Sequence, residues 1–541
     1  MTTISGHIID VRNRRIFKGE ITIDGDRISQ ITERKDVANQ YILPGFIDAH
    51  VHVESSMVVP SEFARMAVVH GTVGTISDPH EIGNVLGVEG VEYMIENGKQ
   101  VNFKFYFGAP SCVPATTFET AGAEITAADV EYLLKKPEVV YLAEMMNWPG
   151  VLYNDPVVYE KLDIAKKLGK PIDGHAPGLR GEQAENYIKA GISTDHECFT
   201  KEEALDKLKH GMKIAIREGS AAKNFEALIP LLSDYPSEIM FCSDDKHPDN
   251  LVEGHINLLV KRALAKGHDL FDVLQAACIN PVDHYGMAVG TLQQGDPADF
   301  VVVNNTDDFK VLATYINGEQ VSQGAESLIP QVENPVINNF HCDPIAMEQI
   351  KIKATSDQVH VIEALDGQLI TNCLTEPVKR DADGNAISDV ERDNLKMVVV
   401  NRYQNADPAV AFIRNFNLKD GAIASSVGHD SHNIVAVGVD DESILKAINL
   451  IIETRGGVSA VSSAEEQVVP LPVAGIMSPN DGYHVAEAYS SIDALSKKMG
   501  SSLNSPFMTL SFMALLVIPA LKLSDLGLFD GEKFEFKPLF A

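Results

Sequence analysis

The stretch Ile42-Leu-Pro-Gly-Phe-Ile-Asp-Ala-His-Val-His52 decides how the rest of the chain is interpreted. Apolar residues lead into a His-x-His pair, and residues two apart on a β-strand point to the same side. His50 and His52 can therefore direct two imidazoles at one point beyond the end of a strand, which is half of a metal site. Because a bare His-x-His pair is more often two ordinary strand histidines, the interpretation depends on what the later strands carry.

Short apolar runs alternate with helix-like stretches from this point to about residue 245. The runs cover residues 46–52, 72–80, 103–110, 139–146, 170–175, 192–197, 212–220 and 238–245. Eight strand–helix pairs are typical of a (β/α)8 barrel, whose active site lies at the C-terminal ends of the strands. We therefore expect an α/β fold with a TIM-like barrel over residues 46–284.

Histidines and carboxylates collect at the ends of these runs, where a barrel has its active site. The candidate metal ligands are His50, His52, Glu144, His175, His196 and Asp244. Such a set can hold two divalent cations with Glu144 between them, and two cations roughly 3.5–4 Å apart lower the pKa of a shared water. Asp244 is suited to accept a proton from that water and pass it to a leaving group. The predicted catalytic residues are therefore Asp244 and Glu144.

A second group of polar residues is predicted to bind substrate. Its members are His80, Glu81, Arg217, Glu218, Asp245, Asp430 and His432. The first five follow the ends of strands, where the alternative is ordinary loop structure. Asp430 and His432 lie in a Ser- and Gly-rich loop far along the chain, which is either a surface turn or a lid that closes over the barrel mouth.

The flanks of the barrel predict two further domains. Residues 1–45 alternate apolar and polar side chains, and residues 285–330 have the same strand-and-turn character, so we expect them to form one small β-sandwich. Residues 335–541 predict a third, α/β domain. Its expected strands and helix cover residues 396–402, 409–414, 421–427, 433–439 and 442–454.

Composition narrows the class of partner and compartment. A net charge of −31 makes nucleic acid and anionic membrane unsuitable partners. No apolar run is long enough to span a bilayer, and the N-terminus lacks the pattern of a signal peptide. The six cysteines are scattered without a Cys-x-x-Cys pair, which predicts reduced thiols in a cytoplasmic protein.

The chain resembles the amidohydrolase superfamily over residues 1–330, with His-x-His on the first strand and an aspartate on the eighth. The fourth run contains no lysine to bridge two metals, which argues against the dihydroorotase and hydantoinase branches and leaves Glu144 as the bridge. Over its whole length the chain is more similar to the bacterial adenine deaminases. The motifs that carry this resemblance lie at residues 44–56, 77–87, 173–178, 241–248 and 424–433.

The resemblance implies a reaction, a cofactor and an assembly. Adenine and water would give hypoxanthine and ammonia in purine salvage, at a binuclear centre holding Mn2+ or Fe2+, while Zn2+ also suits nitrogen and oxygen ligands. Purine N1 would need an acid, for which Glu81, Glu218 and Asp245 remain open. We expect a homo-oligomer, a dimer formed through the β module. The alternatives are a related deaminase or deacetylase acting on another nucleobase or an N-acetyl compound, and a metal-binding protein without catalytic activity.

Overall fold

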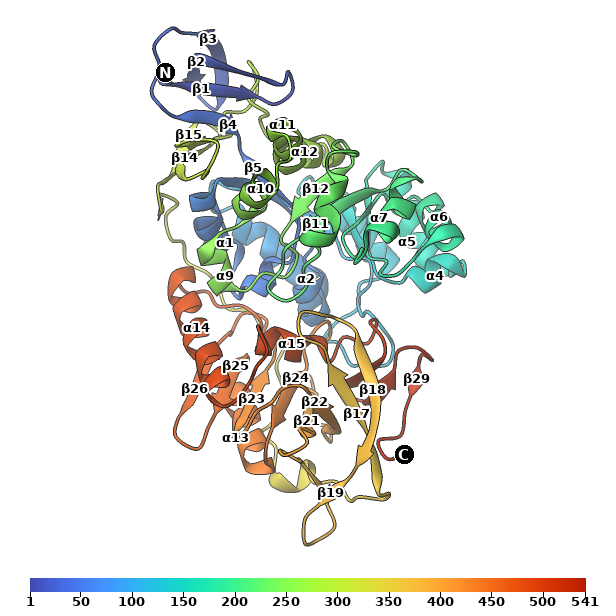
Figure 1. The fold of residues 1–541 in the computed structure, drawn as a ribbon. Helices are drawn as coiled ribbons and strands as arrows, with labels where there is room; N and C mark the ends of the chain where they lie inside the picture. Colours follow the sequence, from blue (N-terminus) through green and yellow to red (C-terminus); the bar gives the residue numbers. More distant parts are fainter.

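The structure is a computed structural model that describes residues 1–541, and it consists of three parts stacked along one axis (Figure 1). The N-terminal strands form a β module at one end. The parallel strands and their helices occupy the middle, and the C-terminal domain, yellow to red in Figure 1, lies at the other end. The site described below lies between the middle part and the C-terminal domain.

The middle part contains a strand in each of the eight predicted runs. Five strands form one parallel sheet: β5 (Phe46–Val51), β6 (Thr72–Ser77), β7 (Lys104–Ala109), β8 (Val139–Met145) and β9 (Ile172–Gly174). Three more form a second parallel sheet: β10 (Thr194–Asp195), β11 (Lys213–Arg217) and β12 (Ile239–Cys242). The α/β fold on parallel strands is confirmed, whereas the hydrogen-bonded ladder is divided into two sheets. One seam falls between β9 and β10, which are the shortest of the eight strands, and the other falls between β12 and β5.

Helices alternate with these strands and cover them, so that β5 is buried at all six positions, as parallel strands require. The helices are α1 (Pro60–Ala67), α2 (His80–Gly98), α3 (Ala127–Leu134), α4 (Trp148–Leu152), α5 (Pro156–Lys167), α6 (Gly181–Lys189), α7 (Lys201–Leu208), α8 (Phe225–Leu228), α9 (Pro248–Glu253), α10 (Ile256–Ala265), α11 (Leu270–Leu274) and α12 (Asn280–Tyr285). Several begin where the sequence supplies a cap: Thr126 accepts a hydrogen bond from the Asp129 amide of α3, and Asp155 accepts one from the Val157 amide of α5.

The two flanks of the middle part share one eight-stranded sheet. Its strands are β1 (Thr2–Asp10), β2 (Arg15–Asp24), β3 (Arg27–Glu33), β4 (Tyr41–Pro44), β13 (Phe300–Val303), β14 (Val311–Ile316), β15 (Glu319–Gln323) and β16 (Glu326–Ser327). The flanks join where β13 pairs antiparallel with β4, with Phe300 opposite Pro44. Because β5 begins directly after β4, this sheet fixes the start of the strand that carries the His-x-His pair.

The C-terminal domain is built on a second eight-stranded sheet, which is mixed. Its strands are β17 (Gln358–Ala364), β18 (Thr371–Pro377), β21 (Leu395–Val400), β22 (Ala409–Arg414), β23 (Ala422–Ser425), β24 (Ile434–Gly438), β25 (Gly457–Val461) and β26 (Glu466–Pro470). Smaller strands are β19 (Lys379–Arg380), β20 (Ala386–Ile387), β27 (Leu521–Ser524), β28 (Gly527–Asp530) and β29 (Glu535–Phe536). The helices of the domain are α13 (Asp441–Thr454), α14 (Gly482–Lys498) and α15 (Pro506–Phe512). The predicted strands and helix of this region correspond to β21 to β24 and α13.

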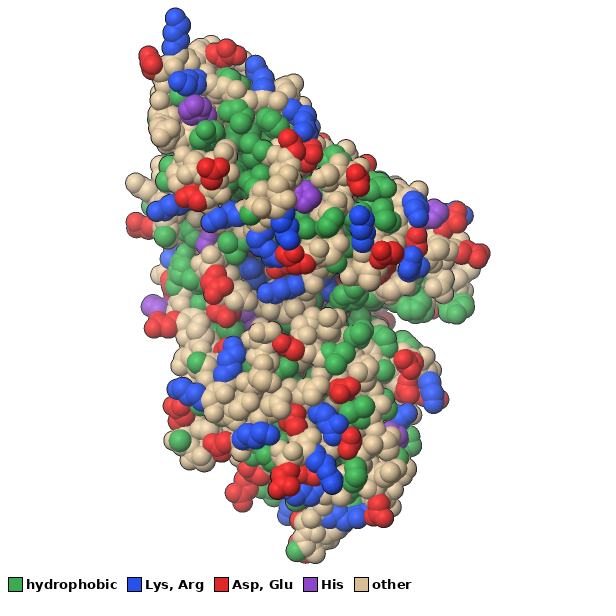
Figure 2. Space-filling model, viewed as in Figure 1, with side chains coloured by type: hydrophobic (Ala, Val, Ile, Leu, Met, Phe, Trp, Pro, Cys, Tyr) green, Lys and Arg blue, Asp and Glu red, His purple; other side chains and the backbone are tan.

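Ion pairs fasten the C-terminal domain to the middle part. Arg65 Nη1 lies 2.6 Å from Glu62 and 3.0 Å from Asp481 at the start of α14, and the Gly482 amide donates to Glu62. On the face drawn in Figure 2, charged side chains of both signs are interspersed over the middle part and the C-terminal domain. In none of the helices is an apolar stretch long enough to cross a lipid bilayer.

Candidate metal centre and active site

A partly open cavity of about 30 Å³ lies where the C-terminal ends of the parallel strands meet the C-terminal domain. The cavity is lined by His52, His80, Glu81, Glu144, Met146, His175, His196, Glu197, Arg217, Asp244, Asp245, Leu369, His429, Asp430, Phe512 and Leu515. All of these side chains are buried except Asp245, which is partly exposed. The cavity therefore combines many ionisable groups with little access to bulk water.

The six predicted metal ligands come together at the polar side of this cavity. His50 Nε2 and His52 Nε2 are 3.2 Å apart. Glu144 lies beside them and receives two more imidazoles, with His175 Nδ1 and His196 Nε2 each 3.0 Å from its Oε2. Glu144 thus belongs to two ligand groups, one with His50 and His52 and the other with His175 and His196.

The backbone around Glu144 holds this strand end in place. Its amide donates to Asp78 at the end of β6, and its carbonyl accepts a hydrogen bond from the Ser111 hydroxyl after β7. Under the cluster, the buried Asp48 of β5 accepts hydrogen bonds from the Ser243 amide and His255 Nε2. Neighbouring strand ends are therefore cross-linked by side chains as well as by the sheet.

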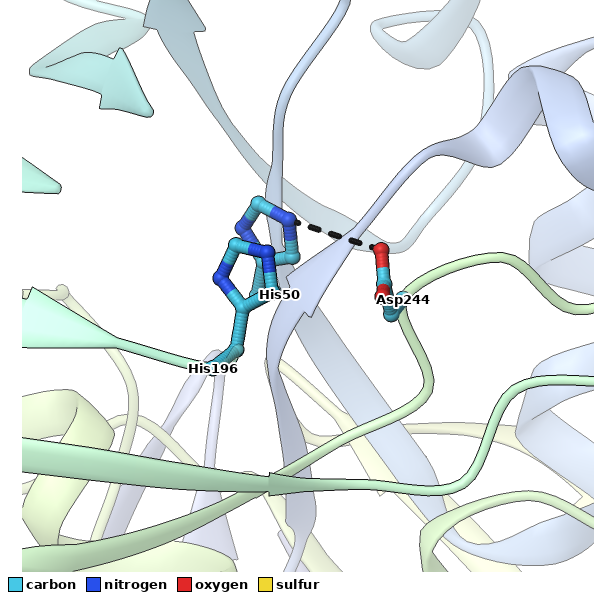
Figure 3. Close-up of side chains that lie close together, drawn as sticks. All are labelled: His50, His196 and Asp244. Carbon is cyan, nitrogen blue, oxygen red and sulfur yellow. Dashed lines mark ion pairs between the residues drawn. The ribbon is translucent and has the colours of Figure 1, made fainter. Parts of the chain in front are cut away.

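Asp244 occupies the eighth strand end with an unusual backbone. Its φ is +55°, in the left-handed region that few non-glycine residues adopt. The conformation is held because its amide donates to the His50 carbonyl while its own carbonyl accepts from the His52 amide. Figure 3 shows the Asp244 carboxylate beside His50, whose ring stacks on His196 with centroids 4.1 Å apart. Asp244 Oδ1 is 3.3 Å from His52 Nε2.

The donor set fits divalent cations. Burial would raise the pKa of Glu144, but His175 and His196 bring it well below its usual value, so the carboxylate is ionised. Burial and the neighbouring His196 lower the pKa of His50, whereas neighbouring carboxylates outweigh burial and raise the pKa of His52, His175 and His196, so these three imidazoles would lose a proton when metal binds. Neutral imidazoles and ionised carboxylates are the forms that bind metal. In addition, His50 Nδ1 and His175 Nε2 are buried without a hydrogen-bond partner.

The predicted substrate-binding residues separate into those inside the cavity and those outside it. His80, Glu81, Arg217, Asp245 and Asp430 line it, so the distant loop of the C-terminal domain does reach the strand ends. His80 Nδ1 lies 3.2 Å from Asp78, and its Nε2 lies 3.8 Å from Asp430. Ser55 donates a hydrogen bond of 2.6 Å to Asp245.

His432 lies behind the cavity wall and contacts the carboxylate of Glu81 together with His429. His429, from the same loop, also lines the cavity. The two imidazoles outweigh burial and bring the pKa of Glu81 well below its usual value. The C-terminal domain therefore sets the charge state of a residue at the start of α2.

Arg217 and Glu218 have different positions. The Arg217 guanidinium contacts both Glu197 and Asp244 inside the cavity, with Nη2 3.0 Å from Glu197. Glu218 does not line the cavity, and its carboxylate pairs with Arg262 at 2.8 Å. The predicted placement of Glu218 at the site is therefore corrected, because adjacent residues at a strand end point to opposite sides.

Several lining residues were not predicted from the sequence. Glu197 directly follows a predicted ligand, so its position at a strand end was a usable signal. Met146, Leu369, Phe512 and Leu515 form the apolar part of the lining, and nothing distinguishes them in the sequence from ordinary core residues.

Comparisons with known proteins agree with this geometry. The profile of the amidohydrolase family matches residues 41–321, and that of the adenine deaminase C-terminal domain matches residues 368–535. A protein of Salinibacter ruber named adenine deaminase is 53% identical over 543 residues, which cover 100% of this chain and 99% of that protein. Adenine deaminases of Sulfurovum sp. and Methanosarcina mazei are 54% and 51% identical, covering 98% and 100% of both chains, respectively. The chain therefore belongs to the amidohydrolase family and, within it, to the adenine deaminases.

Proposed function

We propose that this chain hydrolyses adenine to hypoxanthine and ammonia. The observation that carries this proposal is the pair of ligand groups that share Glu144, with Asp244 beside them in a cavity lined by buried side chains. The similarity to adenine deaminases extends over the whole chain and includes the domain that closes this cavity.

We propose that two divalent cations bind at the site. His50, His52 and Asp244 would hold one, His175 and His196 the other, and Glu144 would lie between them. When bound, the cations supply a water molecule that is acidic enough to act as a nucleophile near neutral pH. Mn2+ and Fe2+ are the metals that the family resemblance favours, and Zn2+ also suits these donors.

Asp244 is the residue placed to move the proton in this reaction. The water oxygen forms a bond to adenine C6, the bond from C6 to the amino nitrogen breaks, and Asp244 carries a proton from the former to the latter. The contact with Arg217 and the nearby His52 offset burial and bring the pKa of Asp244 well below its usual value. Asp244 is thereby ionised and able to accept a proton.

Of the two candidate acids for purine N1 that line the cavity, Asp245 has its pKa raised by burial, which favours the protonated form, whereas Glu81 is ionised beside His429 and His432. The two acids come from different strand ends and lie on the side of the cavity nearest His429. Glu218, the third candidate, faces Arg262 instead. Kinetics of E81Q and D245N, each with adenine, would identify which acid the reaction requires.

A deacetylase that acts on phosphorylated sugars is a weaker alternative. Such a substrate needs a cation to bind its phosphate, and Arg217, the lining arginine, is already paired with Glu197 and Asp244. The deciding experiment measures ammonia release from a panel of purines and cytosine, and acetate release from N-acetylglucosamine 6-phosphate, with metal analysis of the same sample. Release from adenine alone would support the proposal, and release from another member of the panel without adenine would replace it.

Three finer proposals accompany this function. We propose that the two parallel sheets act as one (β/α)8 barrel, which is supported by bonds from the Ser193 amide to Ile172 and from the Asp244 amide to His50 across the two seams. We propose a role in purine salvage in the cytoplasm, a location supported by six unpaired cysteines. We also propose a homodimer through the β module, which light scattering of the purified protein would test.

A further inference from the structure

The side of the cavity opposite the metal ligands is apolar and belongs to the C-terminal domain. Leu369 precedes β18, while Phe512 and Leu515 lie at and just after the end of α15; we call these three residues the roof. Their exposed fractions are 3%, 2% and 5%. The Phe512 ring lies 5.1 Å from that of His429, so the roof adjoins the polar residues of the same domain. A ligand in this cavity would therefore contact apolar side chains on one face and polar side chains along one edge.

One buried lysine bonds to both segments of the roof. Lys522, on β27, is fully buried, and its Nζ donates to the Leu369 carbonyl at 2.6 Å and to the Phe512 carbonyl at 2.9 Å. These two carbonyls are more than one hundred residues apart in the sequence. No carboxylate pairs with Lys522, unlike the buried Lys207 and Lys396, which contact Asp195 and Asp441.

Because no carboxylate pairs with Lys522, placing its amine in the core is energetically unfavourable. Burying an amine costs free energy that two neutral hydrogen bonds only partly offset, and an apolar side chain of similar volume would avoid this cost. What Lys522 provides, and an apolar residue cannot, is a fixed separation between the two carbonyls that it bridges. Those carbonyls belong to residues that line the cavity.

We propose that Lys522 is a positioning residue for substrate binding, because it holds Leu369 and Phe512 so that the roof packs on one face of a planar, uncharged heteroaromatic ring. This inference rests on the proposed function only for the identity of that ring, which would be adenine. The metal ligands and Asp244 then meet the edge of the ring, where the reacting C6 atom lies.

The test compares three substitutions of Lys522 with a matched control in the full-length, metal-loaded protein. K522M removes both donors at similar volume, K522R retains donors, and K522Q keeps a single amide group should K522M fail to fold. The control is K396M, which removes another fully buried lysine of the same domain, one that donates to Ile350 and Asp441. Each variant is also made in a D244N background, so that adenine affinity can be measured by equilibrium dialysis without turnover.

We expect K522M to weaken adenine binding about tenfold, comparable to the loss of a methylene contact in an apolar pocket. K522R should restore most of the affinity, K522Q should lie between, K396M should bind as the parent does, and metal content should not change. An unchanged Kd in K522M or K522Q, or an equal loss in K396M, would overturn the positioning role. A parent protein that binds adenine but releases no ammonia would instead count against the proposed function.

Discussion

Replacing Asp244 with asparagine tests the proposed chemistry most directly. The substitution keeps the size of the side chain and removes its charge and its ability to accept a proton. Asparagine also tolerates the left-handed backbone at this position, where φ is +55°, so the fold should be retained. Arg217 keeps its contacts with Glu197 in the variant, which leaves its charge compensated.

The expected loss of activity follows from the role assigned to Asp244. A positioned acid–base group contributes about 10²–10⁴ in rate, which corresponds to about 3–5 kcal/mol of the activation barrier. We therefore expect kcat of D244N to fall by about two to four orders of magnitude. KM should change less, because the roof and most of the polar edge remain.

The assay follows the ultraviolet change from adenine to hypoxanthine, with metal content measured on the same preparations. A suitable control is D299N, which weakens a buried ion pair between the β module and Lys104 at the start of β7, at the end of that strand remote from the cavity. D299N should lower stability without changing kcat. Wild-type kcat in D244N at full metal content would refute the proton-transfer role, whereas equal losses in both variants would indicate a general effect on folding.

Three further predictions concern stability. R217M leaves Glu197 and Asp244 buried without their cation and should lower the free energy of unfolding by about 3–5 kcal/mol, measured by urea denaturation. Removing bound metal with a chelator should lower the thermal midpoint, by the equivalent of about 4 kcal/mol where the free metal had been 1,000 times its Kd, and calorimetry of the two forms would measure this. Burial lowers the pKa of Lys522 from 10.5 to about 7, so the unfolded chain binds more protons between these values and stability should gain from this group as pH rises. The gain, at most about 1.4 kcal/mol per pH unit, should be absent from K522M in denaturation measured from pH 7 to 10, and parallel pH profiles of the two proteins would contradict it.

The polar half of the site could be predicted because it depends on local sequence. Parallel strands end at one edge of a sheet, so the position of a histidine or carboxylate that ends an apolar run can be predicted. His50, His52 and His175 follow this rule without reference to the rest of the fold. Glu144 required one more step, since it is the carboxylate available on a strand that has no lysine.

Errors arose where strand geometry was not applied at the last residue. Arg217 ends β11 and Glu218 follows it, so the two side chains leave in opposite directions and only Arg217 reaches the cavity. His196 and Glu197 both reach it because β10 ends at Asp195, before either of them. The alternation rule therefore does not extend to two residues that both lie beyond a strand, and the length of a two-residue strand is not visible in the sequence.

The apolar half could not have been predicted by any argument from spacing. Phe512 and Leu515 are three residues apart near a helix end, a pattern that also describes core residues, and Leu369 lies in a separate segment. What makes them part of the site is the docking of the C-terminal domain, through contacts such as Arg65 with Asp481. Lys522 then brings the two roof segments together. The function of a polar residue at a strand end can be predicted from its position in the sequence. An apolar residue belongs to the site only because of the surface that it faces, and that surface forms only when the domains dock.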